Sequence, residues 1–99
     1  MRVRFLSPAE EELAEAAIYY QSLSPGLGVT FVEEVGATVD RILLQPTAWT
    51  RVSEHHRRCL TRRFPFGVIY TIDDDEIVVV SVMNLRRKPN SWKDRAGYP

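Results

Sequence analysis

The alternation of apolar and polar residues predicts one strand followed by two helices at the start of the chain. Residues 2–6 place Val3 and Phe5 on one side and two arginines on the other, which is typical of a half-buried strand. Within residues 9–20 the apolar side chains recur at steps of three or four, and the same spacing continues in residues 27–44. Each of these two segments therefore predicts an amphipathic helix.

Local signals indicate where these helices begin and end. Ser7 is expected to cap the first helix, with Pro8 at its first position and Glu10 completing a capping box. Pro46 is expected to end the second helix. Because the turn between the helices is short, they should form an antiparallel hairpin. The first helix also carries a polar face, interpreted as solvated, that consists of Glu10, Glu11, Glu12 and Glu15.

Three further apolar segments predict a meander of strands at residues 57–64, 66–72 and 76–83. The last of them is apolar on both faces, so it is expected in the interior of the sheet. The first strand is placed beside it. The sequence therefore predicts the order β-α-α-β-β-β, an α+β fold in which a helical hairpin packs on one face of an antiparallel sheet.

The composition changes this picture little. With 44% hydrophobic residues, the chain is expected to form a single folded domain over residues 1–99. No apolar run approaches the roughly 20 residues that cross a bilayer, so no membrane association is expected. Cys59 is the single cysteine and excludes an internal disulfide. A reducing cytoplasm is therefore the expected location.

Charge is distributed unevenly, although the formal net charge of the chain is zero. Residues 1–50 contain three basic and seven acidic residues, a net charge of −4. Residues 51–99 contain ten basic and six acidic residues, a net charge of +4. This asymmetry favours a basic surface with an anionic partner.

The basic residues gather on the first strand of the meander and on the segment after its last strand. Since the helices can cover only one face of the sheet, the other face is expected to be wet and lined with arginine, forming a groove for phosphates or an acidic peptide. An alternative is that these arginines only keep the protein soluble and protect an edge strand. The residues expected to bind this anionic partner are Arg57, Arg58, Arg62, Arg63, Arg86, Arg87, Lys88, Trp92 and Arg95.

Other candidate chemistry is sparse. His55, His56 and Cys59 lie close in sequence, but a second cluster of ligands is missing, so neither a metal site nor a cofactor is predicted. The sequence contains no glycine-rich phosphate loop. Trp92 also has a structural interpretation, because a tryptophan in a terminal segment commonly pins that segment to the core.

The chain resembles the toxins of the RelE/ParE superfamily, which act in bacterial type II toxin–antitoxin systems. The resemblance extends over nearly the whole chain and implies the same α+β fold, a cytosolic protein and a cognate antitoxin that neutralises it. The stretches that carry it are, in order, SPAEEELAEAAIYY, GLGVTFVEEV, RRCLTRRFPFGVIYTIDDDEIVVVSV and RRKPNSW.

Two activities are known in this superfamily. RelE-like members cut ribosome-bound messenger RNA without a metal, which requires a base, an acid and cations that hold the phosphate. ParE-like members bind DNA gyrase and trap its cleavage complex. For a nuclease, the resemblance implies that Arg63 would hold the scissile phosphate and that Glu54 would stand where some members have the general base. Arg58 and Arg86 are the further candidate catalytic residues. Asn84, however, occupies a position where many relatives have histidine, and asparagine cannot transfer protons.

The resemblance therefore predicts a ParE-like toxin that poisons DNA gyrase, causes growth arrest and serves in plasmid stabilisation. A RelE-like, metal-independent endoribonuclease acting on ribosome-bound messenger RNA is the alternative, and an inactive module is a third. The assembly stays open between a homodimer and a toxin–antitoxin hetero-oligomer.

Overall fold

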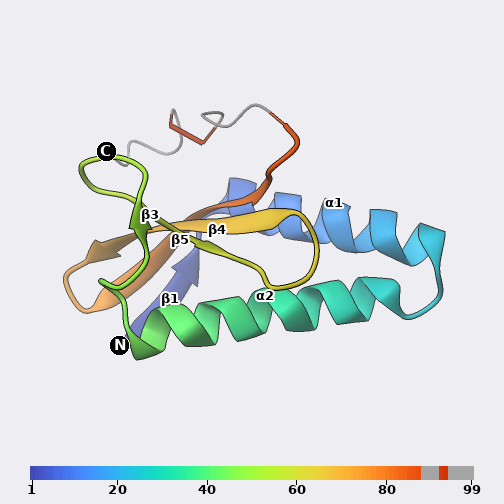
Figure 1. Cartoon of the computed structure of the whole chain (residues 1–99), viewed down its shortest axis with the longest axis horizontal. Helices are drawn as coiled ribbons and strands as arrows, with labels where there is room; N and C mark the ends of the chain where they lie inside the picture. Colours follow the sequence, from blue (N-terminus) through green and yellow to red (C-terminus); the bar gives the residue numbers. More distant parts are fainter. Residues whose placement is uncertain (88–91, 94–99) are drawn as a thin grey trace.

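A five-stranded sheet and a helical hairpin make up the domain (Figure 1). The computed structural model describes residues 1–87 and 92–93. Within this part of the chain the strands follow the spatial order β1-β5-β4-β3-β2. The elements are β1 (Arg2–Phe5), α1 (Ser7–Leu23), α2 (Leu27–Leu44), β2 (Thr50–Arg51), β3 (Arg57–Leu60), β4 (Phe66–Asp73) and β5 (Glu76–Asn84).

The predicted α+β class is confirmed, and β5 is an interior strand as predicted, between β1 and β4. The expected all-antiparallel sheet is wrong at one edge, because β1 runs parallel to β5, with Arg2 opposite Glu76 and Phe5 opposite Val79. Two parallel strands cannot be joined by a tight turn and need a longer crossover connection. Here the helical hairpin is part of that connection, because it returns the chain to the end of the sheet where β1 starts. The sheet is therefore mixed.

The first strand of the meander is shorter than predicted. β3 ends at Leu60, and residues 61–65 form a loop before β4. In this loop the Thr61 hydroxyl donates to the Phe64 carbonyl oxygen at 2.8 Å, and Phe64 adopts a φ of 71°. Such local bonding and a left-handed backbone are incompatible with a continuing strand. A two-residue strand, β2, adds an edge that the sequence pattern did not predict.

The helix starts differ from the expected capping box. Ser7 is the first residue of α1, and Leu6 stands at the cap without a side-chain hydrogen bond. The helices join at Gly26, whose φ of 88° suits glycine. At Gly28 the two helices approach so closely that a Cβ atom would lie 2.5 Å from the carbonyl oxygen of Ala17. Small residues therefore allow the hairpin to close.

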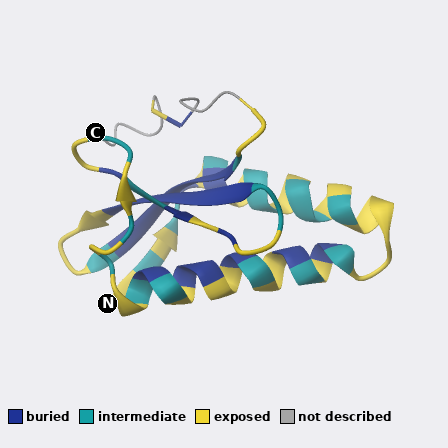
Figure 2. Cartoon of the chain, in the orientation of Figure 1, coloured by how far each residue is buried: buried dark blue, intermediate teal, exposed yellow. Residues whose placement is uncertain are grey.

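The main core lies between the hairpin and the sheet. α2 presents a buried stripe to this core, and β4 and β5 are buried along most of their length (Figure 2). Phe31 is the centre of an aromatic cluster, with ring centroids 5.3 Å from Tyr20, 5.2 Å from Phe64 and 4.8 Å from Phe66. Burial of these rings provides much of the driving force for folding.

The opposite face of the sheet is apolar too, so the prediction of a wet, arginine-lined face is wrong. Six buried side chains form a second cluster there: Leu6, Ile69, Val78, Val80, Met83 and Trp92. The interpretation of Trp92 as a core anchor is confirmed, since its side chain is buried and its ring lies 4.8 Å from that of His56. Neither helix in the described residues is long and apolar enough to span a membrane.

Candidate target-binding surface

Two basic segments that are distant in sequence meet at one end of the sheet. Phe66 at the start of β4 pairs with Asn84 at the end of β5, and the Leu85 amide donates to the Pro65 carbonyl oxygen at 2.9 Å. These bonds place the loop before β4 beside the turn after β5. We call the arginines of these two segments the basic rim: Arg62, Arg63, Arg86 and Arg87.

The first half of the basic rim is fixed to α2. The Glu34 carboxylate accepts hydrogen bonds from the backbone amides of Arg62 at 2.5 Å and Arg63 at 3.2 Å. The Arg63 guanidinium lies 5.7 Å from the ring centroid of Phe64, which is packed in the core against Tyr20. Because the backbone holds the loop, the side chain of Arg62 can extend into solvent.

Asn84 shapes the second half of the basic rim. Its side-chain oxygen accepts a hydrogen bond from the Arg86 amide at 2.9 Å, and its carbonyl oxygen accepts one from the Arg87 amide at 3.1 Å. Both arginines are exposed. An asparagine that bonds the backbone two residues ahead stabilises a turn. Asn84 therefore stabilises a turn that exposes Arg86 and Arg87, and its own amide side chain cannot transfer a proton.

A cavity of ≈ 540 Å³ lies between this turn and α1. We call it the rim cavity. Its lining combines aromatic, acidic and basic side chains, and those of greatest chemical interest are Glu12, Tyr19, Tyr20, Asn84, Arg86 and Arg87. Burial, followed by the charge of Tyr19, raises the pKa of Tyr20, while Arg86 opposes the shift. Tyr20 is consequently a neutral hydrogen-bonding group near neutral pH.

Glu12 was missed by the sequence interpretation, which assigned it to a solvated face. Its carboxylate accepts hydrogen bonds from the Ser81 hydroxyl at 2.9 Å and the Val82 amide at 3.0 Å. A register shift lies opposite this part of β5, between Ile69 and Tyr70, and bulges of this kind leave backbone groups unpaired. Glu12 therefore supplies a hydrogen-bond acceptor to β5 at the position where the sheet is irregular. The helical spacing of the sequence alone could not reveal this contact.

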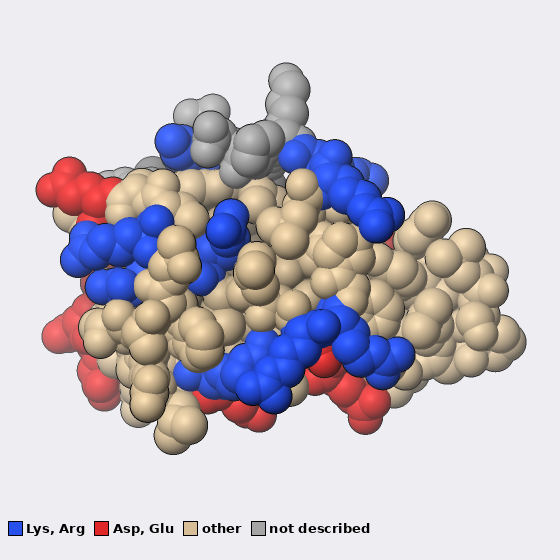
Figure 3. Space-filling view, viewed as in Figure 1, with Lys and Arg blue, Asp and Glu red and all other residues tan. Residues whose placement is uncertain are grey.

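The strand arginines do not join the basic rim. Arg57 pairs across the ladder with Tyr70 of the main core, and Arg58 with Ile69 of the second cluster. Partners in an antiparallel ladder share a face, so Arg57 and Arg58 point to opposite sides of the sheet. On the face drawn in Figure 3, the Lys and Arg side chains form several separate groups, so they do not line one continuous groove there.

The candidate nuclease residues are likewise divided. Glu54 lines a different cavity from Arg86, and its carboxylate lies 3.8 Å from the ring nitrogen of His55. The stem of Arg58 packs over Gly67, where a Cβ atom would lie 3.1 Å from it. Residues 1–87 with 92–93 contain no cluster of three His, Cys, Asp or Glu side chains that could hold a metal. Lys88 and Arg95 lie outside the described residues.

Comparison with known proteins agrees with this fold. Residues 3–89 match the family model described as the ParE toxin of type II toxin–antitoxin system, parDE. The chain therefore belongs to the ParE toxin family of type II toxin–antitoxin systems. No curated protein matches it significantly.

A solved structure titled "Chromosomal ParDE TA system from P. aeruginosa" has a similar fold, with a TM-score of 0.76. The alignment covers 86% of this chain and 96% of that one, at 19% sequence identity. At this identity the similarity concerns the fold alone.

Proposed function

We propose that this chain is a ParE-like toxin that acts in the cytoplasm by binding DNA gyrase, causes growth arrest and is neutralised by a cognate antitoxin. The observation that carries the proposal is the turn at Asn84, where Arg86 and Arg87 are exposed while the asparagine side chain is engaged with the backbone. Such a site provides cations for binding. It provides no general acid or base at the position where nuclease relatives have histidine.

The basic rim is the proposed contact with the target. Arg86 and Arg87 line the rim cavity, whose tyrosines can contact a partner through both ring and hydroxyl. Arg62 and Arg63 extend from the anchored loop before β4. Guanidinium groups on a rigid support suit recognition of carboxylate or phosphate groups. Lys88 and Arg95 would extend this contact, and Trp92 would hold their segment near the sheet.

The antitoxin has a second surface available. The outer face of the hairpin carries exposed apolar side chains, with Ile18 71% and Val29 62% exposed, and these residues line a groove of ≈ 480 Å³. Exposed apolar surface of this kind is typical of a protein interface. We propose that the antitoxin covers this groove and uses an acidic segment on the basic rim.

Assays on two targets test the activity. Purified protein is added to gyrase during DNA supercoiling, with trapped and cleaved DNA measured, and separately to ribosomes carrying messenger RNA. We expect trapped DNA and intact RNA. RNA cuts at defined codon positions with unaffected gyrase would contradict the proposal and support the RelE-like ribonuclease.

Paired variants test the surface. The double variant Arg86→Glu and Arg87→Glu should abolish growth arrest without loss of folding, because both side chains are exposed. Arg2→Glu is the control, since this exposed arginine of β1 lies outside the basic rim and lines neither of the basic cavities. Equal loss of toxicity in both would show that only net charge matters. Co-expression of the antitoxin should restore growth with the unmodified toxin.

A further inference from the structure

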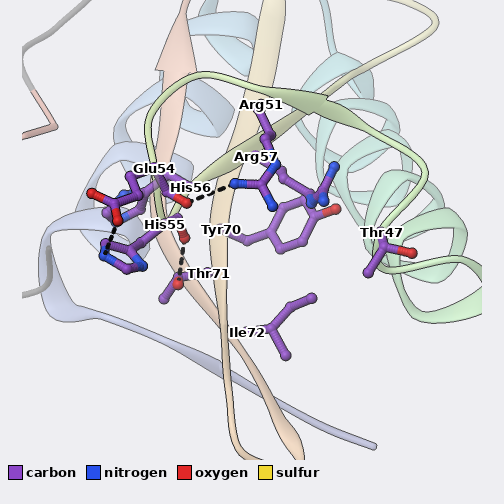
Figure 4. A pocket seen from close by; sticks show the side chains of 9 residues that line it. All are labelled: Thr47, Arg51, Glu54, His55, His56, Arg57, Tyr70, Thr71 and Ile72. Atoms are coloured by element: carbon purple, nitrogen blue, oxygen red, sulfur yellow. Dashed lines mark hydrogen bonds and ion pairs between the residues drawn. The ribbon is translucent and has the colours of Figure 1, made fainter.

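A second basic site lies at the other end of the sheet, apart from the basic rim. A cavity of ≈ 200 Å³ is bounded by the residues around β2, the following loop and the adjacent parts of β3 and β4 (Figure 4). We call it the arginine pocket. The side chains that give it its chemical character are Arg51, His55, His56, Arg57 and Tyr70. It shares no lining residue with the rim cavity.

Both guanidinium groups of the arginine pocket are held by neutral partners. Arg57 donates to the Trp49 carbonyl oxygen at 2.8 Å, and Arg51 donates to the Glu54 carbonyl oxygen at 2.8 Å. Within the described residues neither arginine forms an ion pair. Each guanidinium has five N–H donors, and these bonds use one of them. Both guanidinium groups are therefore held in place while most of their N–H donors and their positive charge remain available for a ligand.

The acid that could neutralise this charge is directed elsewhere. The Glu54 side chain is 87% exposed, and its carboxylate lies 3.8 Å from the His55 ring. Figure 4 shows this carboxylate turned toward His55, while the side chains of Arg51 and Arg57 lie beside the ring of Tyr70. The arginine pocket consequently keeps its positive character. A solvent-exposed pairing of Glu54 with His55 contributes little to stability.

Tyr70 forms a rigid and uncharged wall of the arginine pocket. Its hydroxyl donates to the Pro46 carbonyl oxygen at 2.5 Å, which ties the loop after α2 to the sheet. Burial raises the pKa of Tyr70 to about 12, although the charge of Arg57 opposes the shift. The phenol therefore stays protonated at neutral pH and does not repel an anion. A preformed site of this kind needs little reorganisation on binding.

We propose that the arginine pocket binds a phosphate monoester. Two guanidinium groups without a paired acid match a doubly charged oxyanion with several acceptor oxygens. The volume of ≈ 200 Å³ is below the roughly 300–1,000 Å³ of pockets that enclose drug-sized ligands. It is suited to a phosphoryl group with a small part of the molecule that carries it. This inference does not depend on the proposed action on gyrase.

The test uses the full chain and three probes: inorganic phosphate, a 5′-phosphorylated dinucleotide and the same dinucleotide without the terminal phosphate. Binding is followed through the side-chain Nε–H signals of arginine in ¹⁵N-correlated NMR spectra. We expect the signals of Arg51 and Arg57 to shift with the first two probes and not with the third. Equal binding of both dinucleotides would overturn the proposal in favour of a phosphodiester contact.

Variants distinguish binding at the arginine pocket from non-specific attraction to any surface arginine. Arg57→Gln and Arg51→Gln should each weaken phosphate binding by roughly tenfold or more, as expected for the loss of a charge-assisted hydrogen bond. Arg62→Gln, which removes a cation from the basic rim, should leave it unchanged. Arg51 is exposed, so its variant should fold normally even if Arg57→Gln does not. Unchanged affinity in Arg51→Gln, or an equal loss in Arg62→Gln, would refute the site.

Discussion

Both faces of the sheet carry buried apolar clusters, but different parts of the chain cover them. On one face, two helices bury a large aromatic and aliphatic core around Phe31. On the other, the smaller cluster of Ile69, Val78 and Val80 is completed by Trp92, which lies beyond the last strand. The second face thus depends on a terminal segment. A change in that segment can alter both stability and the proposed target binding, so the two effects have to be measured separately.

Removing the central ring of the main core should have the largest effect. Phe31→Ala removes a fully buried side chain that contacts three other aromatic rings, so we expect a loss of about 4–5 kcal/mol in the free energy of unfolding. Chemical denaturation measures it. Small domains are stable by roughly 5–15 kcal/mol, so this variant should be close to unfolding. A loss below 1 kcal/mol would show that the hairpin core can collapse around the gap.

Removing the tryptophan that completes the second cluster should reduce stability by a smaller amount. Trp92→Ala is expected to lower the free energy of unfolding by about 3 kcal/mol, the lower end for such substitutions, because the other side of the sheet stays packed. Trp92→Phe should retain part of this stability. If Trp92→Ala is as stable as the unmodified chain, the second face does not depend on the terminal segment.

The link between α1 and β5 should have a smaller effect. Glu12→Ala leaves the Ser81 hydroxyl and the Val82 amide without their carboxylate acceptor, so a loss of about 2 kcal/mol is expected. Glu11→Ala, an exposed position on the same helix, is the matched control and should change stability by less than about 0.5 kcal/mol. Equal stability of the two variants would show that Glu12 is solvated after all.

The smallest expected effect is a pH dependence from the second cluster. Burial, with His55 as a lesser cause, lowers the pKa of His56 below its ordinary value, so the unfolded chain binds a proton more readily than the folded one. Stability should therefore be unaffected by this group above the ordinary value of 6.5 and should fall as the pH decreases below it.

A matched variant isolates this contribution. In His56→Gln the decrease in melting temperature between pH 7 and pH 5 should be shallower than in the unmodified chain. Tryptophan fluorescence should follow the same trend, because the Trp92 ring packs on His56 at 4.8 Å. Identical pH profiles would assign the acid sensitivity to other groups.

The sequence pattern was most informative where one periodicity extended over a long segment. It predicted both helices, the interior position of β5 and the anchoring role of Trp92. It could not predict the direction of β1, because alternation specifies which face a residue occupies and not which way its strand runs. The second cluster did have a signal, since Val78 and Val80 are apolar on the face that the hairpin cannot cover.

The candidate site was only partly predictable for a related reason. Basic residues were identified by type, yet their grouping depends on where β3 ends and on the ladder register. Because β3 ends at Leu60, Arg62 and Arg63 lie in the loop that bonds to the turn after β5, whereas alternation separates Arg57 from Arg58. Arg51 is paired with Arg57 across the ladder of β2 and β3, and β2 is a strand too short to produce a recognisable pattern.

The pairing of β1 with β5 has a consequence for synthesis. Arg2 is opposite Glu76, so the first strand has no partner until more than seventy further residues have been made. At about 5–20 residues per second this takes roughly 4–15 s. Contacts between distant parts of a chain also form slowly once available. The sheet therefore closes only after most of the chain has been translated, and a nascent chain that stops before β5 lacks both dry faces and the turn at Asn84.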